Sequence, residues 1–230
     1  MSVFKFLPNS IPISINETLR YMGVRGQASP SEESLAKSAV EKASATLSPQ
    51  VCYVICDVIC GEDYVDLGFG RICSNSLKKL LENCGSAIVF AATSGAAADR
   101  LISTGKAMGV STALAFDAAA TAFTESLCDS FCEHITETLT PAEALTMRFS
   151  PGYGDVPLDL QKDIFRILDC PKNIGLTLTD SLLMVPSKSV TAIMGITHNN
   201  VKTPEHHCTN HGKCSGCNMK TCIYRKEENQ

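Results

Sequence analysis

Four cysteines lie close together near the C-terminus at spacings that suit a metal. Within HHCTNHGKCSGCNMKTCIYR they are separated by five, two and four residues, with glycines between them that permit tight turns. Thiolates are soft ligands that hold zinc or an iron–sulfur cluster. A zinc ion would fold this short tail, which cannot build its own core, whereas an iron–sulfur cluster could transfer electrons. We favour the cluster, on these predicted ligands: Cys208, Cys214, Cys217 and Cys222.

The other eight cysteines need a different interpretation. Most lie within apolar segments, where cysteine packs as a small hydrophobic residue. The first residues, MSVFKFLPNSIPIS, lack the apolar region of a secretory signal, and reducing compartments keep thiols free. No apolar stretch approaches the length of a membrane span. We therefore expect a cytoplasmic protein with free thiols and no association with a membrane.

Composition and charge exclude several classes of protein. The 230 residues are 44% hydrophobic and 19% charged, which is typical of a globular chain that buries a sizeable core. Twenty basic residues against 24 acidic ones give a net charge of −4, which argues against a nucleic-acid binder. The apolar segment at 87–92 runs into a helix without the glycine patterns GxGxxG or GxxxxGKS/T, so ordinary packing is favoured over phosphate binding there.

The hydrophobic pattern predicts helices mixed with strands. We expect helices over residues 16–22, 31–45, 75–83, 96–108, 112–139 and 158–168. We expect strands over residues 3–7, 51–59, 87–92, 175–179 and 189–196, with 64–67 as a hairpin partner of 51–59. From Thr197 onward the composition becomes polar and rich in His and Cys. This change predicts two units, residues 1–199 and residues 200–230.

The long helix at 112–139 carries two contrasting faces. Its apolar residues recur every four positions and predict a buried stripe: Leu127, Phe131, Ile135 and Leu139. Its acidic residues recur in the same way on another face: Glu125, Asp129, Glu133 and Glu137. Like charges four residues apart disfavour burial, so we expect most of this acidic row to be a solvated surface.

A loop with the sequence RFSPGYGDVP, residues 148–157, separates this helix from the next. It is dense in proline and glycine, which pins the backbone in sharp turns. Taken alone, a Pro-Gly-Tyr turn before a helix is common and favours a structural role. Taken alone, Arg148 could equally form an ordinary surface ion pair.

The loop is the first of three motifs in a fixed order. An Arg-to-Tyr loop precedes a helix, then come a Gly-x-x-Leu-Thr-Asp-Ser stretch and a Pro-x-x-Ser-Val-Thr strand. Together, over roughly the second half of the chain, they resemble the activation domain of cobalamin-dependent methionine synthase, and this combination outweighs the purely structural interpretation. The residues that carry the resemblance are Arg148, Pro151, Gly152, Tyr153, Gly175, Leu178, Thr179, Asp180, Ser181, Pro186, Ser189, Val190 and Thr191.

The resemblance implies both a fold and a function. The implied fold is α+β, a twisted and mainly antiparallel sheet with flanking helices, one of them long, here joined to a small metal-binding C-terminal tail. The implied function is to bind S-adenosylmethionine and support the reductive methylation of cob(II)alamin. The chain has no Asp-x-His-x-x-Gly corrinoid motif, so the cobalamin would sit on a partner, a corrinoid methyltransferase similar to methionine synthase.

The resemblance also implies roles for individual residues. Arg148 would bind the carboxylate of the methionyl group through its guanidinium fork, and Ser150 would present backbone groups to the ligand. Gly152 would let the chain turn close to it, and Tyr153 would supply a ring wall and a hydroxyl. Asp129 stands in the place of a family glutamate that holds the ammonium group, one methylene shorter.

Two functions remain open at this stage. The first is a reactivation component of a cobalamin-dependent methyltransferase system, served by an electron donor such as a flavodoxin or ferredoxin. The second is a non-catalytic metal-binding adaptor that keeps the fold and docks to a corrinoid protein. An effect of S-adenosylmethionine is expected only for the first.

Overall fold

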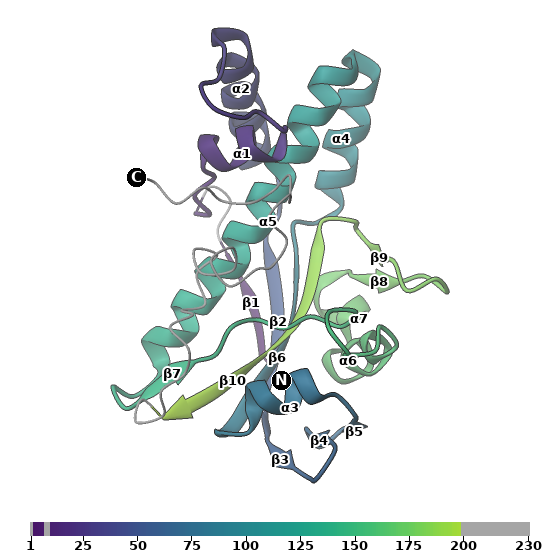
Figure 1. Cartoon of the computed structure of the whole chain (residues 1–230). Helices are drawn as coiled ribbons and strands as arrows, with labels where there is room; N and C mark the ends of the chain where they lie inside the picture. Colours follow the sequence, from purple (N-terminus) through teal and green to yellow (C-terminus); the bar gives the residue numbers. More distant parts are fainter. Residues whose placement is uncertain (1, 7–9, 199–230) are drawn as a thin grey trace.

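The computed structural model describes residues 2–6 and 10–198 and has an α+β fold (Figure 1). Its main sheet is antiparallel throughout, with strand order β1-β2-β6-β10-β7. The strands are β1 (Ser2–Lys5), β2 (Gln50–Asp57), β6 (Cys84–Thr93), β7 (Glu143–Leu145) and β10 (Ser189–His198). The predicted fold class is confirmed, apart from the metal-binding tail, which lies outside the described residues.

The central strand β6 is apolar along most of its length because both of its faces are covered. Ile88 and Phe90 point into one hydrophobic core, and Val89 and Ala91 point into a second core on the opposite face. Side chains alternate between the two faces of a strand, so covering both faces removes the usual polar alternation. The uninterrupted run AIVFAA therefore predicts the middle of the sheet, where β6 lies between β2 and β10.

Four helices cover one face of the sheet: α1 (Ile15–Tyr21), α2 (Pro30–Thr46), α4 (Ala96–Met108) and α5 (Val110–Thr138). In Figure 1, α5 runs diagonally across the sheet with the other three near its first half. The predicted apolar stripe is confirmed, since Leu127, Phe131 and Ile135 are buried and Phe131 packs 5.0 Å from Phe90, centroid to centroid.

Helix α2 begins one residue earlier than the sequence pattern predicts. Ser29 is its N-cap and accepts from the backbone of Glu32, whose carboxylate accepts in return from the Ser29 backbone. This capping box satisfies two backbone donors that the helix cannot pair internally. Pro30 occupies the first helical position, where a missing N–H costs nothing. In α1 the N-cap is Ser14, whose side chain accepts from the backbone N–H of Glu17.

The opposite face of the sheet is covered by α3 (Asn75–Leu81), α6 (Leu160–Leu168) and α7 (Cys170–Ile174). Two small sheets flank them, one of β3 (Ile59–Cys60), β4 (Val65–Asp66) and β5 (Arg71–Ile72), the other of β8 (Thr177–Leu178) and β9 (Met184–Val185). The predicted hairpin partner at 64–67 thus pairs with β3 and β5 instead of β2. The strand expected at 175–179 shrinks to two residues outside the main sheet.

The eight cysteines of the described residues are all free thiols. Five of them are buried, as expected for small hydrophobic residues: Cys52, Cys84, Cys128, Cys132 and Cys170. Among residues 2–6 and 10–198, no helix combines the length and the apolarity that a bilayer crossing requires.

Candidate functional site

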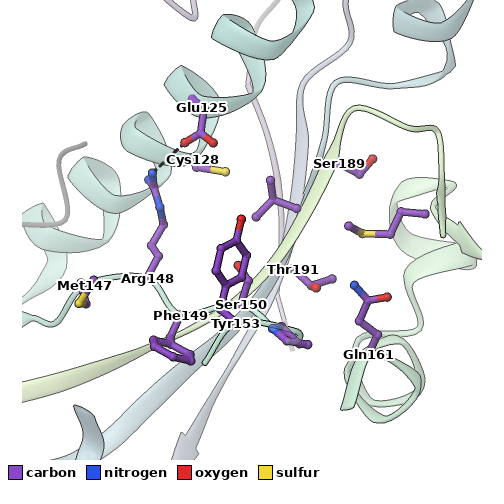
Figure 2. Close-up of a pocket in the computed structure, with 13 residues that line it drawn as sticks. Glu125, Cys128, Met147, Arg148, Phe149, Ser150, Tyr153, Gln161, Ser189 and Thr191 are labelled. Carbon is purple, nitrogen blue, oxygen red and sulfur yellow. Dashed lines mark hydrogen bonds and ion pairs between the residues drawn. The ribbon is translucent and has the colours of Figure 1, made fainter. Parts of the chain in front are cut away.

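A cavity of about 440 Å³ lies beside the first residues of β10, and its volume falls in the range of small-molecule sites. The loop that begins at Met147 forms one wall, α5 supplies Glu125 and Cys128, and α6 supplies Gln161 (Figure 2). Strand β10 closes the cavity with Ser189, Val190 and Thr191. Met184 of β9 also lines the cavity, so residues from five separate parts of the chain meet around one space.

The loop reaches the cavity because it is hydrogen-bonded to the sheet at its start. Phe149 and Ile193 exchange backbone hydrogen bonds of 2.9 Å in each direction. Beyond this bridge the chain turns away from β10, so the strand has no described neighbour on that side from Ser189 to Ala192. The open strand edge and the departing loop together enclose the cavity.

Beyond that bridge the loop folds back on itself through left-handed glycines. Gly152 and Gly154 have φ angles of 86° and 56°, which L-residues with a side chain rarely adopt. The Gly152 amide donates to the Val156 carbonyl at 3.0 Å, and the Tyr153 amide donates to the Ser150 carbonyl at 3.2 Å. Gly152 therefore permits a sharp turn at this point of the loop.

Asp155 fixes the far end of the loop to helix α3. Its carboxylate accepts from the Ser74 hydroxyl at 2.6 Å and from the backbone amides of Asn75 and Ser76 at 2.7 and 3.1 Å. Hydrogen bonds from the Ser74 and Ser76 side chains, with those amides, hold the pKa of Asp155 well below its ordinary value. An ionised carboxylate thus anchors the loop to the helix N-terminus.

Arg148 lies at the base of the cavity with only 5% of its side chain exposed. One terminal nitrogen, Nη1, donates to Asp129 Oδ1 at 2.7 Å, and the other, Nη2, donates to Glu125 Oε2 at 3.3 Å. Burial lowers the pKa of this guanidinium, but the neighbouring thiols and carboxylates raise it by more, so it stays above its ordinary value. The group is therefore a fixed cation held between two acids of α5.

The two acids of that triad occupy different positions. Glu125 lines the cavity and leaves 35% of its side chain exposed. Asp129 is 27% exposed, forms the shorter contact with Arg148, and does not line the cavity. The acidic row is thus a solvated surface at Glu133 and Glu137, which are exposed, and an ion-pair site at its first two members.

The structure brings four of the five predicted ligand-binding residues to the cavity region. Arg148, Ser150 and Tyr153 line it, and Gly152 shapes the loop between them. Tyr153 is 69% exposed, and Figure 2 shows its ring standing in the middle of the group of lining residues. The fifth residue, Asp129, pairs with Arg148 and does not line the cavity.

The sequence interpretation gave no ligand-binding role to Glu125, Gln161 or Thr191, although all three line the cavity. Glu125 was interpreted only as part of the acidic row, although it lies four residues before Asp129 and so shares its helix face. Gln161 gave no local signal, because a glutamine in an amphipathic helix is an ordinary residue. Thr191 belongs to the Pro-x-x-Ser-Val-Thr motif, but that motif was used only for the resemblance and not for a site. Only the tertiary structure, in which α6 packs against β2, β6 and β8, brings Gln161 and Thr191 to one cavity.

The candidate metal ligands fall into two groups, those within the described residues and those of the tail. Within residues 2–6 and 10–198, no group of three or more His, Cys, Asp or Glu side chains is placed to hold an ion. The predicted ligands Cys208, Cys214, Cys217 and Cys222 lie outside the described residues. Burial raises the pKa of the Cys128 thiol beside the cavity, so that sulfur stays neutral.

Comparisons with known proteins agree with this architecture. Residues 89–206 match a family described as "Vitamin B12 dependent methionine synthase, activation domain". Among solved structures, a crystal structure of the MetH reactivation domain bound to AdoHcy matches with a TM-score of 0.61 and 18% identity, over 88% of this chain and 79% of that one. At that identity the likeness concerns the fold. No curated protein matches the chain.

Proposed function

The chain belongs to the family of vitamin B12-dependent methionine synthase activation domains, and on that premise we propose that it binds S-adenosylmethionine to reactivate a corrinoid methyltransferase. The observation that carries the proposal is the buried Arg148 guanidinium, paired with the partly exposed Glu125, at one end of a ligand-sized cavity. The solved relative was crystallised with AdoHcy, the demethylated product of S-adenosylmethionine, which supports the same class of ligand here.

The charges at this end of the cavity complement an amino-acid zwitterion. Arg148 offers a cation for a carboxylate and Glu125 offers an anion for an ammonium group. Arg148 has five N–H donors, and the described contacts use three of them, to Asp129, Glu125 and the Cys132 sulfur. A ligand carboxylate can therefore accept from a remaining donor or exchange one of the carboxylate contacts. The Glu125 contact is the exchangeable one, because it is 0.6 Å longer than the Asp129 contact (3.3 − 2.7 Å) and its carboxylate is more exposed.

The geometry of the cavity favours Glu125 over Asp129 for the ammonium-binding role that the resemblance implies. We assign the ammonium group to Glu125, which lines the cavity, and give Asp129 the role of holding Arg148 in place. Tyr153, exposed and central, would lie against the sulfonium part of the ligand, where an aromatic face favours a positive charge. Ser150 accepts a backbone hydrogen bond from Tyr153 and so fixes the ring relative to the loop.

Cobalamin enters the proposal as a group of the partner. Methyl transfer from a sulfonium to reduced cobalamin is strongly favourable and draws forward the otherwise uphill reduction of cob(II)alamin. This chain's share is to hold the donor at the loop, shield it from water on the sheet side and keep it oriented. The electron donor, a flavodoxin or a ferredoxin, remains part of the proposal.

The test is a mixed assay. The protein, S-adenosylmethionine and a reductant are added to a partner corrinoid methyltransferase loaded with cob(II)alamin, and methylcobalamin is followed by its absorption spectrum. We expect methylcobalamin only when all components are present. Calorimetry with S-adenosylmethionine alone should show binding to the isolated chain. Docking to the partner with no effect of S-adenosylmethionine would instead favour the adaptor function.

The division into residues 1–199 and 200–230 and the metal in the tail also remain proposals. We expect the four tail cysteines to bind an iron–sulfur cluster or, as the second choice, zinc. Metal analysis and a visible spectrum of an anaerobic preparation decide between them, since only the cluster absorbs broadly in the visible range. Replacing Cys214 and Cys217 by serine should abolish binding, and metal-free protein of native sequence would refute the proposal.

A further inference from the structure

Two buried polar atoms beside the cavity have no hydrogen-bond partner among the described residues. They are the amide oxygen of Gln161, on α6, and the hydroxyl of Thr191, on β10. The two residues are 6% and 2% exposed, and both line the cavity. Buried polar atoms are nearly always satisfied, so two orphans facing one cavity indicate a missing partner.

Within the described part of the chain, the lack of a hydrogen-bond partner is specific to Thr191 among the hydroxyl residues of β10. Ser189 lies two residues before Thr191 on β10 and lines the same cavity, yet its hydroxyl lies 2.8 Å from both Thr93 Oγ1 and the Pro186 carbonyl. Thr197, farther along the strand, donates to the Asn83 carbonyl at 3.1 Å. The described residues therefore provide partners for the other hydroxyls of this strand but not for the Thr191 hydroxyl, which is available to a ligand.

The backbone of β10 adds polar groups at the same place. Ile193 directs its N–H and C=O toward Phe149, and residues two apart on a strand direct these groups to the same side. The N–H and C=O of Thr191 therefore also face away from β6, along the open edge that has no described neighbour strand. Main-chain and side-chain groups of one residue thus converge on the cavity.

These groups lie at the opposite end of the cavity from the charged pair. Figure 2 shows Gln161 and Thr191 on one side of the Tyr153 ring and Arg148 with Glu125 on the other. One end is thus ionic, and the other is neutral but rich in hydrogen-bonding groups. A ligand that satisfies both ends has a zwitterionic group and a neutral polar group, joined by a less polar middle.

We propose that Gln161 and Thr191 form the subsite for the nucleoside half of the ligand, an inference that rests on the proposed binding of S-adenosylmethionine. The Gln161 amide oxygen accepts one hydrogen bond, and the Thr191 hydroxyl can both donate and accept. The matching groups on a nucleoside are the ribose hydroxyls and the amino edge of the base. The two residues set specificity and take no part in methyl transfer.

The test compares Thr191→Val, Gln161→Met and a matched control, Thr197→Val, by calorimetry with AdoHcy and by thermal unfolding. Valine replaces threonine with almost the same shape. Removing an unpartnered hydroxyl should leave Tm unchanged or raise it, whereas affinity should fall about three- to tenfold for each cavity variant. The control removes a partnered hydroxyl outside the cavity, so it should lower Tm and leave affinity unchanged.

Ligand analogues identify the contacted group. AdoHcy lacking the ribose 2′-hydroxyl and AdoHcy with inosine in place of adenosine are each titrated into wild type and both cavity variants. At least one analogue should bind wild type more weakly than AdoHcy does, yet bind a cavity variant as well as AdoHcy does. The reason is that the ligand group and the side chain are the two partners of one hydrogen bond, so removing the second partner costs nothing more. Full affinity for AdoHcy in both variants would overturn the subsite. Failure of wild type to bind AdoHcy would refute the proposed function itself.

Discussion

Replacing Arg148 by methionine tests the ion-pair triad that underlies the site. Methionine keeps a long unbranched side chain but removes the charge and all the donors. Asp129 and Glu125 would then lose a guanidinium that lies 2.7 and 3.3 Å away, and two carboxylates would remain one helical turn apart. The protein should lose both stability and ligand affinity.

The magnitude follows from burial and distance. Charges about 4 Å apart attract by about 4 kcal/mol at an effective dielectric constant of about 20. Removing one member of a buried ion pair costs about 3–5 kcal/mol. Here the two acids keep 27% and 35% of their side chains exposed and can be rehydrated, which lowers the cost. We therefore expect Arg148→Met to lower the free energy of unfolding by about 2–3 kcal/mol.

Urea unfolding followed by circular dichroism measures this loss, and Arg166→Met is the matched control. Arg166 pairs with Asp163 at 2.9 Å, but the two side chains are 64% and 46% exposed. An exposed pair contributes little, so the control should cost less than about 0.5 kcal/mol. A similar small loss in both variants would refute the argument from burial.

Amide substitutions separate the roles of Asp129 and Glu125 in stability and in ligand binding. Asp129→Asn should lower the free energy of unfolding by about 1 kcal/mol, because it weakens the shorter contact of a buried guanidinium. Glu125→Gln should change stability less and affinity for S-adenosylmethionine more, since Glu125 lines the cavity. Arg148→Met should weaken binding about 10- to 150-fold. Unchanged binding by folded Arg148→Met would remove this residue from the site.

Two further predictions concern the elements that support the cavity. Asp155→Ala should lower Tm and weaken ligand binding, because it releases the loop from α3. The pKa of Asp155 is lowered by folding, so its stabilisation is present above the ordinary pKa of about 3.9 and is lost as pH falls further; the Tm gap between wild type and variant should narrow below that pH. Gly195→Ala should cost about 1–3 kcal/mol, because its new methyl would collide with the Cys84 sulfur inside the sheet. Its control, Gly85→Ala, meets nothing within 4 Å and should be close to neutral, and equal losses in the two variants would contradict the packing argument.

Local patterns identified most elements of the fold. The helix at 96–108 has the predicted bounds, and the long helix differs by two residues at its start and one at its end. Strands 87–92 and 189–196 were also found, each a few residues short. These elements could be predicted because their apolar periodicity is strong and continuous. The short strands could not be predicted, because a strand of two residues is too short to show an alternating pattern.

The site was predicted less completely than the fold. The loop residues Arg148, Ser150, Gly152 and Tyr153 share one motif, and a motif within six residues is visible in the sequence. The partner of Arg148 depends on how the loop crosses α5. The contacts that position the loop join residues far apart, 19 positions for Arg148 and Asp129 and 81 for Ser74 and Asp155. No local pattern encodes a pairing over such separations.

By itself, the sequence determined which segments are helices and strands, which faces they bury, and which loop carries polar groups, because hydrophobic periodicity and turn chemistry act between residues a few positions apart. Tertiary structure alone decided the sheet order, the union of Arg148 with two acids of α5, and the convergence of Gln161 and Thr191 on one cavity. The reason is physical. These contacts arise when distant segments pack to bury apolar surface, and a polar residue's partner is then set by the neighbour that this packing brings within hydrogen-bond reach.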